Sequence, residues 1–129
     1  MAKQQKKPTD KELEILQVIW ADGPSNVRHI NEVLAAKTGI GYTTTLKLMQ
    51  IMFEKGLLSR SKDGKSHIYS SEVSKDHAQG QIIDKLMNTV FNGSVKSLVM
   101  QALGNKKSSK KELDEIRAYL DKLEGGIGD

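Results

Sequence analysis

The chain has 129 residues, of which 37% are hydrophobic, 28% charged and only 5% aromatic, and this favours one small helix-rich protein over a β-sandwich or two large domains. It has no cysteine, so disulfides and thiolate metal sites are excluded. The net charge of +4 is uneven, because residues 1–70 hold 11 Lys and Arg against 7 Asp and Glu (11 − 7 = +4), whereas residues 71–129 hold 9 of each (9 − 9 = 0). This excess indicates a polyanionic partner for the first half, although lysines that only keep a surface soluble would also explain it.

The N-terminal third of the chain predicts two short amphipathic helices. Thr9 and Glu12 form a capping box, and apolar residues at helical spacing follow as far as the next turn. Ser25 or Asn26 then caps a second helix, which ends near Gly39. Each helix has one apolar stripe, so both are expected to pack against other elements of the same domain.

A third helix is expected between Tyr42 and Gly56. The glycine stands where a left-handed residue commonly ends a helix. Apolar residues recur along this segment at helical spacing, and we expect Leu46, Met49 and Phe53 on its buried face.

The pattern then changes from helical spacing to short extended segments. Strands are expected at 58–62 and 65–70, joined at the dipeptide Asp63-Gly64, which is a strong hairpin signal. Three short helices followed by a basic hairpin are typical of a winged helix-turn-helix.

Three further amphipathic helices are expected after the hairpin, beginning at Ser74, Ser94 and Ser109. The last of them has an apolar seam with the 3-4-3 spacing of a coiled coil. These helices have more apolar faces than so few residues can bury, so we expect a second copy of the chain to cover them. Folding back onto the N-terminal domain is the alternative. The residues expected in the homodimer interface are Ile83, Leu86, Val90, Leu98, Leu113, Ile116, Leu120 and Leu123.

The expected fold is mainly α: a winged helix-turn-helix with a small β-hairpin wing, followed by a three-helix dimerisation region. The corresponding boundaries are residues 1–72, residues 73–124 and a flexible tail at 125–129. No stretch is apolar for long enough to cross a bilayer, and the N-terminus lacks the apolar run of a secretory signal. We therefore expect a cytoplasmic protein.

The residues give little support to an enzyme. His29, His67 and His77 fall on three different predicted elements, with no pair at the spacing of metal ligands on one helix. No glycine-rich phosphate loop or nucleophile elbow is present, and most carboxylates alternate with lysines along helix faces. We predict a protein without catalytic residues, metal, cofactor or small-molecule substrate. A small hydrolase or metal-dependent enzyme would require the three histidines to converge on a pocket with a carboxylate.

Three consecutive threonines begin the third helix, although β-branched residues are poor helix formers. In a helix-turn-helix this turn enters the major groove, where hydroxyls bind phosphates or bases and threonine methyls contact thymine. Basic residues of the hairpin would neutralise the flanking phosphates. The residues predicted to contact double-stranded DNA are Tyr42, Thr43, Thr44, Thr45, Lys47, Arg60, Lys62 and Lys65.

Two alternatives accompany this interpretation. Thr43 could act as a plain N-cap, with Tyr42 as a hydrophobic staple. The whole domain could also be a winged-helix module that binds another protein and no DNA. A protein-binding wing would more commonly expose apolar residues than the stretch "SRSKDGKS".

From "TDKELEILQVIW" through "YTTTLKLMQIMFEKGLLSRSKDGKSHIYS" to "FNGSVKSLVMQAL", the chain resembles the penicillinase-repressor family over roughly residues 8–123. The joint spacing of "YTT", "KGL" and the "DG" wing carries this resemblance. It implies a homodimeric transcriptional repressor, whose N-terminal winged helix binds an inverted-repeat operator and whose C-terminal helices form the dimer. The operator-contacting residues that it implies are Tyr42, Thr43, Thr44 and Lys47, with Arg60 and Lys65 on the wing.

The chain departs from two inducible patterns of that family. Copper-responsive members carry a C-terminal cysteine motif, and this chain has no cysteine. In the antibiotic-resistance repressors, induction follows cleavage of an Asn-Phe bond after the "SLV" motif, where this chain has Gln101 and Ala102. Release by a membrane sensor protease would therefore require a protease of altered specificity.

Overall fold

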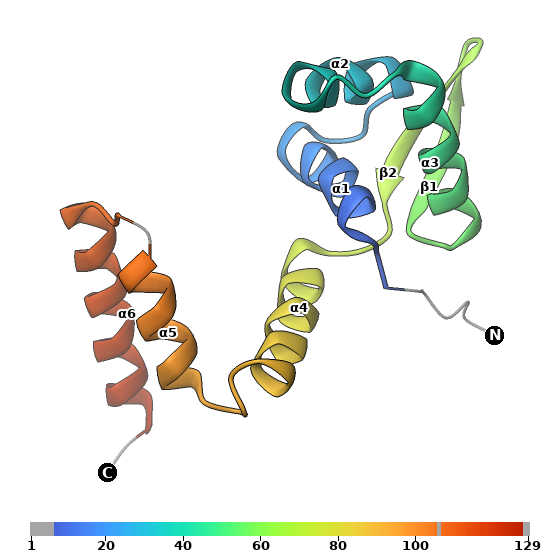
Figure 1. Ribbon diagram of the computed structural model, residues 1–129. Helices are drawn as coiled ribbons and strands as arrows, with labels where there is room; N and C mark the ends of the chain where they lie inside the picture. Colours follow the sequence, from blue (N-terminus) through green and yellow to red (C-terminus); the bar gives the residue numbers. More distant parts are fainter. Residues whose placement is uncertain (1–6, 106, 128–129) are drawn as a thin grey trace. The chain divides into compact units, whose positions relative to one another are not determined.

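The computed structural model describes residues 7–105 and 107–127. Within them the chain forms six helices and one antiparallel hairpin (Figure 1). It divides into two compact units, Met1–Gln81 and Ile82–Asp129, and this division falls within α4, whereas the expected boundary lay after residue 72. The elements are α1 (Asp10–Asp22), α2 (Val27–Thr38), α3 (Tyr42–Glu54), β1 (Leu58–Asp63), β2 (Ser66–Ser71), α4 (Lys75–Thr89), α5 (Val95–Asn105) and α6 (Lys110–Ile127).

Side-chain caps begin the first two helices of the first unit as predicted. At α1 the Thr9 hydroxyl accepts a hydrogen bond from the Glu12 backbone at 3.2 Å, and the Glu12 carboxylate accepts one from the Thr9 backbone at 2.9 Å. At α2 the Asn26 side chain accepts from the His29 backbone at 2.8 Å, so Asn26 rather than Ser25 is the cap. These bonds satisfy N–H groups that helix geometry leaves without an internal partner.

Glycine ends α3 where the sequence predicted. Gly56 has φ +83°, and the Leu57 N–H donates to the Met52 carbonyl at 2.9 Å while the Gly56 N–H donates to the Phe53 carbonyl at 3.1 Å. This pair of bonds is a Schellman motif, which requires a left-handed residue after the helix. The chain is thereby turned directly from α3 into β1.

The hairpin is one residue longer on its first strand than expected. Asp63 pairs with Ser66, so the loop consists of Gly64 and Lys65 rather than being centred on Asp63-Gly64. Gly64 has φ +63°, the positive value that the first central residue of a type II′ turn needs. Lys65 consequently lies at the tip of the hairpin.

The second strand also pairs with the segment between α1 and α2. Ser25 and Tyr69 exchange two backbone hydrogen bonds, with N–O distances of 3.0 and 2.8 Å. Beyond the end of β2, the Trp20 indole N–H donates to the Val73 carbonyl at 2.9 Å. The hairpin is therefore attached to the helical part through β2 and the residues that follow it.

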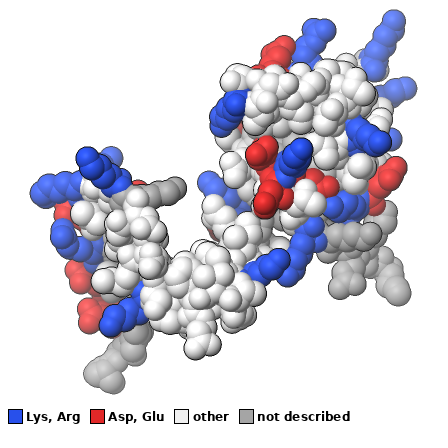
Figure 2. Space-filling model, in the orientation of Figure 1, with Lys and Arg blue, Asp and Glu red and all other residues white. Residues whose placement is uncertain are grey.

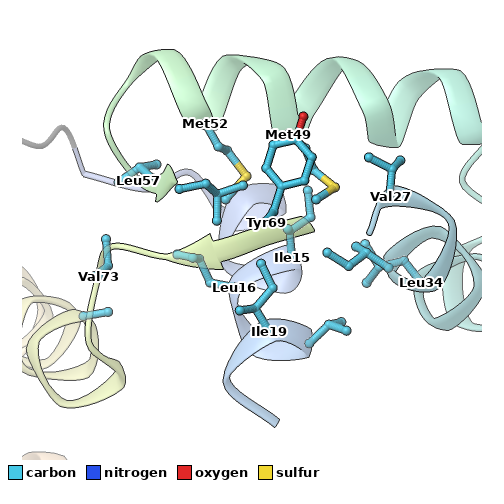
Figure 3. Close-up of a cluster of buried hydrophobic side chains, with 14 residues drawn as sticks. Ile15, Leu16, Ile19, Val27, Leu34, Met49, Met52, Leu57, Tyr69 and Val73 are labelled. Atoms are coloured by element: carbon cyan, nitrogen blue, oxygen red, sulfur yellow. The ribbon is translucent and has the colours of Figure 1, made fainter. Parts of the chain in front are cut away.

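The core of the first unit lies between α1, α2, α3 and the hairpin (Figure 3). Ile15 and Leu16 of α1, Met49 and Met52 of α3, and Tyr69 of β2 are almost completely buried. Leu46 and Phe53, which were expected on the buried face of α3, pack against this core and are half-buried. The three helices and the hairpin form a winged helix-turn-helix, as the sequence predicted.

A buried ion pair joins the start of α1 to the end of α3. The Lys55 ammonium lies 2.6 Å from the Glu12 carboxylate, and the side chains are 18% and 3% exposed. The same carboxylate oxygen accepts the capping bond from Thr9. Because the carboxylate is buried, these two donors replace the hydrogen bonds that water would otherwise give it.

The helices of the second unit begin at the predicted serines. Ser94 accepts from the Ser97 backbone at 3.1 Å, and Ser109 accepts from the Glu112 backbone at 3.0 Å. α6 continues through two glycines to Ile127, so the expected flexible tail from 125 is wrong as far as that residue; residues 128–129 lie outside the described residues. Extending an existing helix needs no new nucleus, which offsets the poor propensity of glycine.

Lys55→Met is expected to lower the free energy of unfolding by about 3 kcal/mol, because it leaves the Glu12 carboxylate buried without its cation. Adding Glu12→Gln should restore most of this loss, since a glutamine oxygen can still accept the capping bond from Thr9. Urea unfolding at one protein concentration measures both variants. Lys62→Met, at an exposed position, is the matched control and should change stability by less than about 0.5 kcal/mol. If Lys55→Met were as stable as Lys62→Met, the ion pair between Lys55 and Glu12 would contribute nothing to stability.

Candidate nucleic-acid interface

The first turn of α3 presents hydroxyl groups to solvent. Tyr42 is 50% exposed, and Thr43 and Thr44 are exposed as well. The helix begins after Gly41, which is the N-cap residue, so Tyr42 and Thr43 are already helical. The alternative in which Thr43 caps the helix is therefore wrong. The Thr43 and Thr44 hydroxyls remain on the surface of the turn.

Thr45 corrects the predicted set of DNA-contacting residues, because its side chain is fully buried. Its hydroxyl accepts a hydrogen bond from the Asn31 amide at 2.9 Å and donates one to the Gly41 carbonyl at 3.2 Å. The Asn31 amide also donates to the Ile40 carbonyl at 3.0 Å. Thr45 and Asn31 thus fix the turn between α2 and α3, and the fully buried Thr45 side chain is not available to a ligand.

Helical spacing explains why Thr45 is inside. Thr45, Met49 and Met52 are separated by four and three residues, so they share one face of α3, and all three are fully buried. Asn31 was missed in the sequence because nothing local distinguishes its half-buried amide from the other polar side chains of α2. The signal that could have identified Thr45 was the helical spacing itself.

The remaining predicted cations lie on the outside of the first unit. Lys47 on α3, Lys62 on β1 and Lys65 at the tip of the hairpin are exposed. Figure 2 shows Lys and Arg side chains projecting from the edge of this unit where Figure 1 places the hairpin. The predicted residues of α3 and of the hairpin therefore belong to the surface of one unit, with Thr45 as the exception.

Arg60 is held more firmly than a free surface arginine. Its guanidinium carbon lies 4.0 Å from the centre of the Phe53 ring, which is a cation–π contact between β1 and α3. Arginine keeps its hydrogen-bond donors available at the edges while its plane stacks on a ring. Arg60 is therefore both exposed and directed by the helix beside it.

The second unit exposes apolar side chains along all three of its helices. Of the residues predicted for the dimer interface, Ile83, Val90, Leu120 and Leu123 are 45%, 66%, 55% and 46% exposed. The other four, Leu86, Leu98, Leu113 and Ile116, are half-buried. Val95, Met100 and Tyr119, which were not predicted, are each more than 60% exposed. Among the described residues of α5, none is classed as buried.

Gln101 and Ala102, which the family resemblance indicated as a candidate region for proteolysis, are exposed on α5. They lie within a regular helix that extends from Val95 to Asn105. A protease requires an extended substrate, so cleavage at this bond would need local opening of α5.

No three His, Asp or Glu side chains in residues 7–105 and 107–127 are placed to hold a metal ion. His29 instead pairs with Asp22 at 2.8 Å across the connection between α1 and α2. None of the described helices is long and apolar enough to cross a membrane.

Residues 8–122 match a model of the penicillinase repressor family. The chain belongs to this family. The penicillinase repressor of Bacillus licheniformis is 26% identical over 114 residues, which cover 88% of each chain. The transcriptional regulator BlaI of Mycobacterium tuberculosis is 26% identical over 121 residues, covering 92% of this chain and 86% of the relative.

The fold agrees with that family. The solution structure of the DNA-binding domain of the repressor BlaI superposes with a TM-score of 0.51 and 24% identity, covering 57% of this chain and 93% of that domain. This likeness concerns the fold alone. Membership of a penicillinase repressor family, whose members are named as repressors and transcriptional regulators, also agrees with the prediction that the chain is not an enzyme.

Thr45→Val is expected to lower the free energy of unfolding by about 1–2 kcal/mol, because valine fills the same volume but leaves the Asn31 amide and the Gly41 carbonyl without their shared partner. Thr44→Val, at the exposed neighbouring position, is the matched control and should change stability by less than about 0.5 kcal/mol. Urea unfolding of both variants makes the comparison. If the two variants were equally stable, the hydroxyl of Thr45 would have no role in fixing the turn.

Proposed function

We propose that this member of the penicillinase repressor family is a cytoplasmic, homodimeric, sequence-specific DNA-binding repressor that acts at an inverted-repeat operator. The observation that carries the proposal is the exposed first turn of α3, with its Thr43 and Thr44 hydroxyls. The other face of the same helix is buried in the core. Relatives of this chain are named as repressors and transcriptional regulators.

The chemistry of this turn suits base edges in a major groove. Threonine hydroxyls can donate to or accept from bases and phosphates, and their methyl groups can contact thymine. The first N–H groups of α3 point out of the helix at the same end and attract phosphate. Lys47, one turn further along and exposed, can reach a phosphate or a guanine edge.

The hairpin would provide the part of the affinity that does not depend on sequence. Arg60, Lys62 and Lys65 are exposed on the wing, where they can neutralise phosphates beside the groove that α3 enters. Each neutralised phosphate releases counterions, so the affinity should fall steeply with salt. Repression would follow because a bound dimer occupies promoter DNA that RNA polymerase needs.

The second unit would supply the dimer. Its exposed apolar residues need a cover, and the seam Leu113, Ile116, Leu120 and Leu123 has coiled-coil spacing. A second copy of the chain brings the same seam by symmetry, which presents two α3 helices to two half-sites. An inverted-repeat operator would match that symmetry.

Release from the operator by proteolysis is the less constrained part of the proposal. The exposed bond between Gln101 and Ala102 lacks an aromatic residue, so a sensor protease that acts here would have a different specificity from one that cuts an Asn-Phe bond.

Selection of bound duplexes from a random pool tests the proposal directly. We expect a palindromic sequence to be recovered, with half-sites about one helical turn apart. Recovery of no sequence at low salt, together with no gel shift on promoter fragments, would contradict DNA binding and favour a protein-binding winged helix.

Thr44→Ala is expected to weaken binding of the selected duplex by about tenfold while leaving a random duplex unchanged, because base contacts carry the sequence preference. Lys62→Ala should weaken both duplexes equally and reduce the slope of log K against log salt by about 1.8, because it removes one phosphate contact from each protomer of the dimer. Fluorescence anisotropy titrations over a range of salt concentrations measure both effects. A Thr44→Ala variant that weakened both duplexes alike would show that Thr44 does not read bases.

Leu120→Glu is expected to shift the protein towards monomer and to weaken operator binding by about 100-fold or more, because the two readers would no longer be linked. Ala118→Glu places the same charge on the same helix, two positions before Leu120 and off the seam, and is the matched control. Sedimentation and anisotropy measure mass and affinity. A Leu120→Glu variant that remained a dimer would remove the α6 seam from the proposed interface.

A further inference from the structure

A groove separates the start of α2, the outer face of α3 and the hairpin. It has a volume of ≈ 620 Å³ and lies entirely within the first unit. Arg28 lines it from α2, Tyr42 and Gln50 from α3, and Arg60, Lys65 and His67 from the hairpin. Arg28, Gln50 and His67 are the residues of this set to which the sequence assigned no DNA contact, and Arg28 and His67 are the ones whose side chains can carry positive charge.

The charge of the groove has one sign. Arg28, Arg60 and Lys65 are cationic, and no Asp or Glu is among the described residues that line it. The hairpin has one acidic residue, Asp63, and alternation along the strand places it on the opposite face from Arg60 and from His67. Low-dielectric walls that carry charges of one sign concentrate the field, so this groove should attract an anion.

Two walls of the groove are already ordered. Arg60 stacks on Phe53 with 4.0 Å between the guanidinium carbon and the ring centre. The His67 ring stands edge-on to the buried Tyr69 ring, with centres 6.3 Å apart and an angle of 73°. Tyr69 is in turn fixed by its backbone bonds to Ser25. An anion that binds here would therefore order fewer side chains than on an open lysine surface.

We propose that this groove binds a phosphodiester of the DNA backbone, with Arg28 and His67 as contact residues additional to Arg60 and Lys65. The inference rests on the proposed function and adds the chemical group that is held between α2 and the wing. A phosphate seated there lies beside the exposed turn of α3, since Tyr42 belongs to both. It would set the depth and register at which α3 enters the major groove.

The experiment uses the full-length protein and the duplex recovered by selection, in which single phosphates are replaced in turn by uncharged methylphosphonates. Wild-type protein should lose about tenfold in affinity at one symmetric pair of positions that flank the bases read by α3. In Arg28→Gln and in His67→Gln, replacement at that pair should cost much less, because the contact is already weakened. Losses at all other positions should stay as in the wild type.

Lys37→Gln and His77→Gln are the matched controls, since Lys37 lies at the other end of α2 and His77 on α4, and neither lines the groove. Both should retain the wild-type methylphosphonate profile. Circular dichroism and urea unfolding establish that the variants fold. Arg28→Gln should also lower the salt slope by about 1.8 on selected and random duplexes alike, because each protomer of the dimer loses one phosphate contact.

The outcomes separate this inference from the proposed function. If the wild type bound DNA and both groove variants gave the same methylphosphonate profile as the wild type, the groove proposal would be overturned and the repressor proposal would stand. If the wild type bound no duplex, both proposals would be overturned. Sodium phosphate and sodium chloride at equal ionic strength form the last arm. If phosphate displaced DNA more strongly from the wild type than from Arg28→Gln, the groove would be supported, because free phosphate would compete there with the phosphodiester.

Discussion

The hydrogen bonds that connect Asn31, Thr45 and the Gly41 carbonyl fix the turn between α2 and α3, and the proposed function depends on this turn. The Thr45 side chain is fully buried, so no water competes for its hydroxyl, and the single amide of Asn31 closes the turn on two sides by also binding the Ile40 carbonyl. The turn fixes one end of α3, and Met49 and Met52 pack beneath the helix, so α3 is held in one orientation about its own axis. That orientation leaves Thr43 and Thr44 outside.

The three threonines of this turn therefore have two different uses. The Thr45 hydroxyl stabilises the turn, whereas the Thr43 and Thr44 hydroxyls are exposed and can contact a ligand. The low helix propensity of threonine costs a fraction of a kilocalorie per residue, on the order of 0.5 kcal/mol, which a buried hydrogen bond of about 1 kcal/mol offsets only at Thr45. No buried hydrogen bond offsets this cost at the exposed Thr43 and Thr44. This is the physical reason to propose DNA as their partner.

The hairpin and the second unit extend the same reasoning to larger surfaces. The wing is tied to the helices through Tyr69, Trp20 and the contact of Arg60 with Phe53, so its cations are displayed at a defined distance from α3. The surface of the second unit is apolar where the wing is cationic, since it exposes valine, leucine, methionine and tyrosine side chains whose exposure to water is unfavourable. A repressor that covers this surface with its own copy would couple folding of the dimer to the spacing of its two DNA readers.

Local patterns in the sequence predicted the helices, the hairpin, the caps at Thr9 and Asn26, the left-handed Gly56 and the family, because caps, turns and periodicity involve residues within a few positions of one another. They also identified the exposed residues Tyr42, Thr43, Thr44 and Lys47 as surface candidates. Contacts between distant segments could not be predicted in this way. The burial of Thr45 against Asn31, the pairing of Glu12 with Lys55 and the groove that brings Arg28 to His67 join residues 14, 43 and 39 positions apart, and only the packed structure decides which of many polar side chains meet.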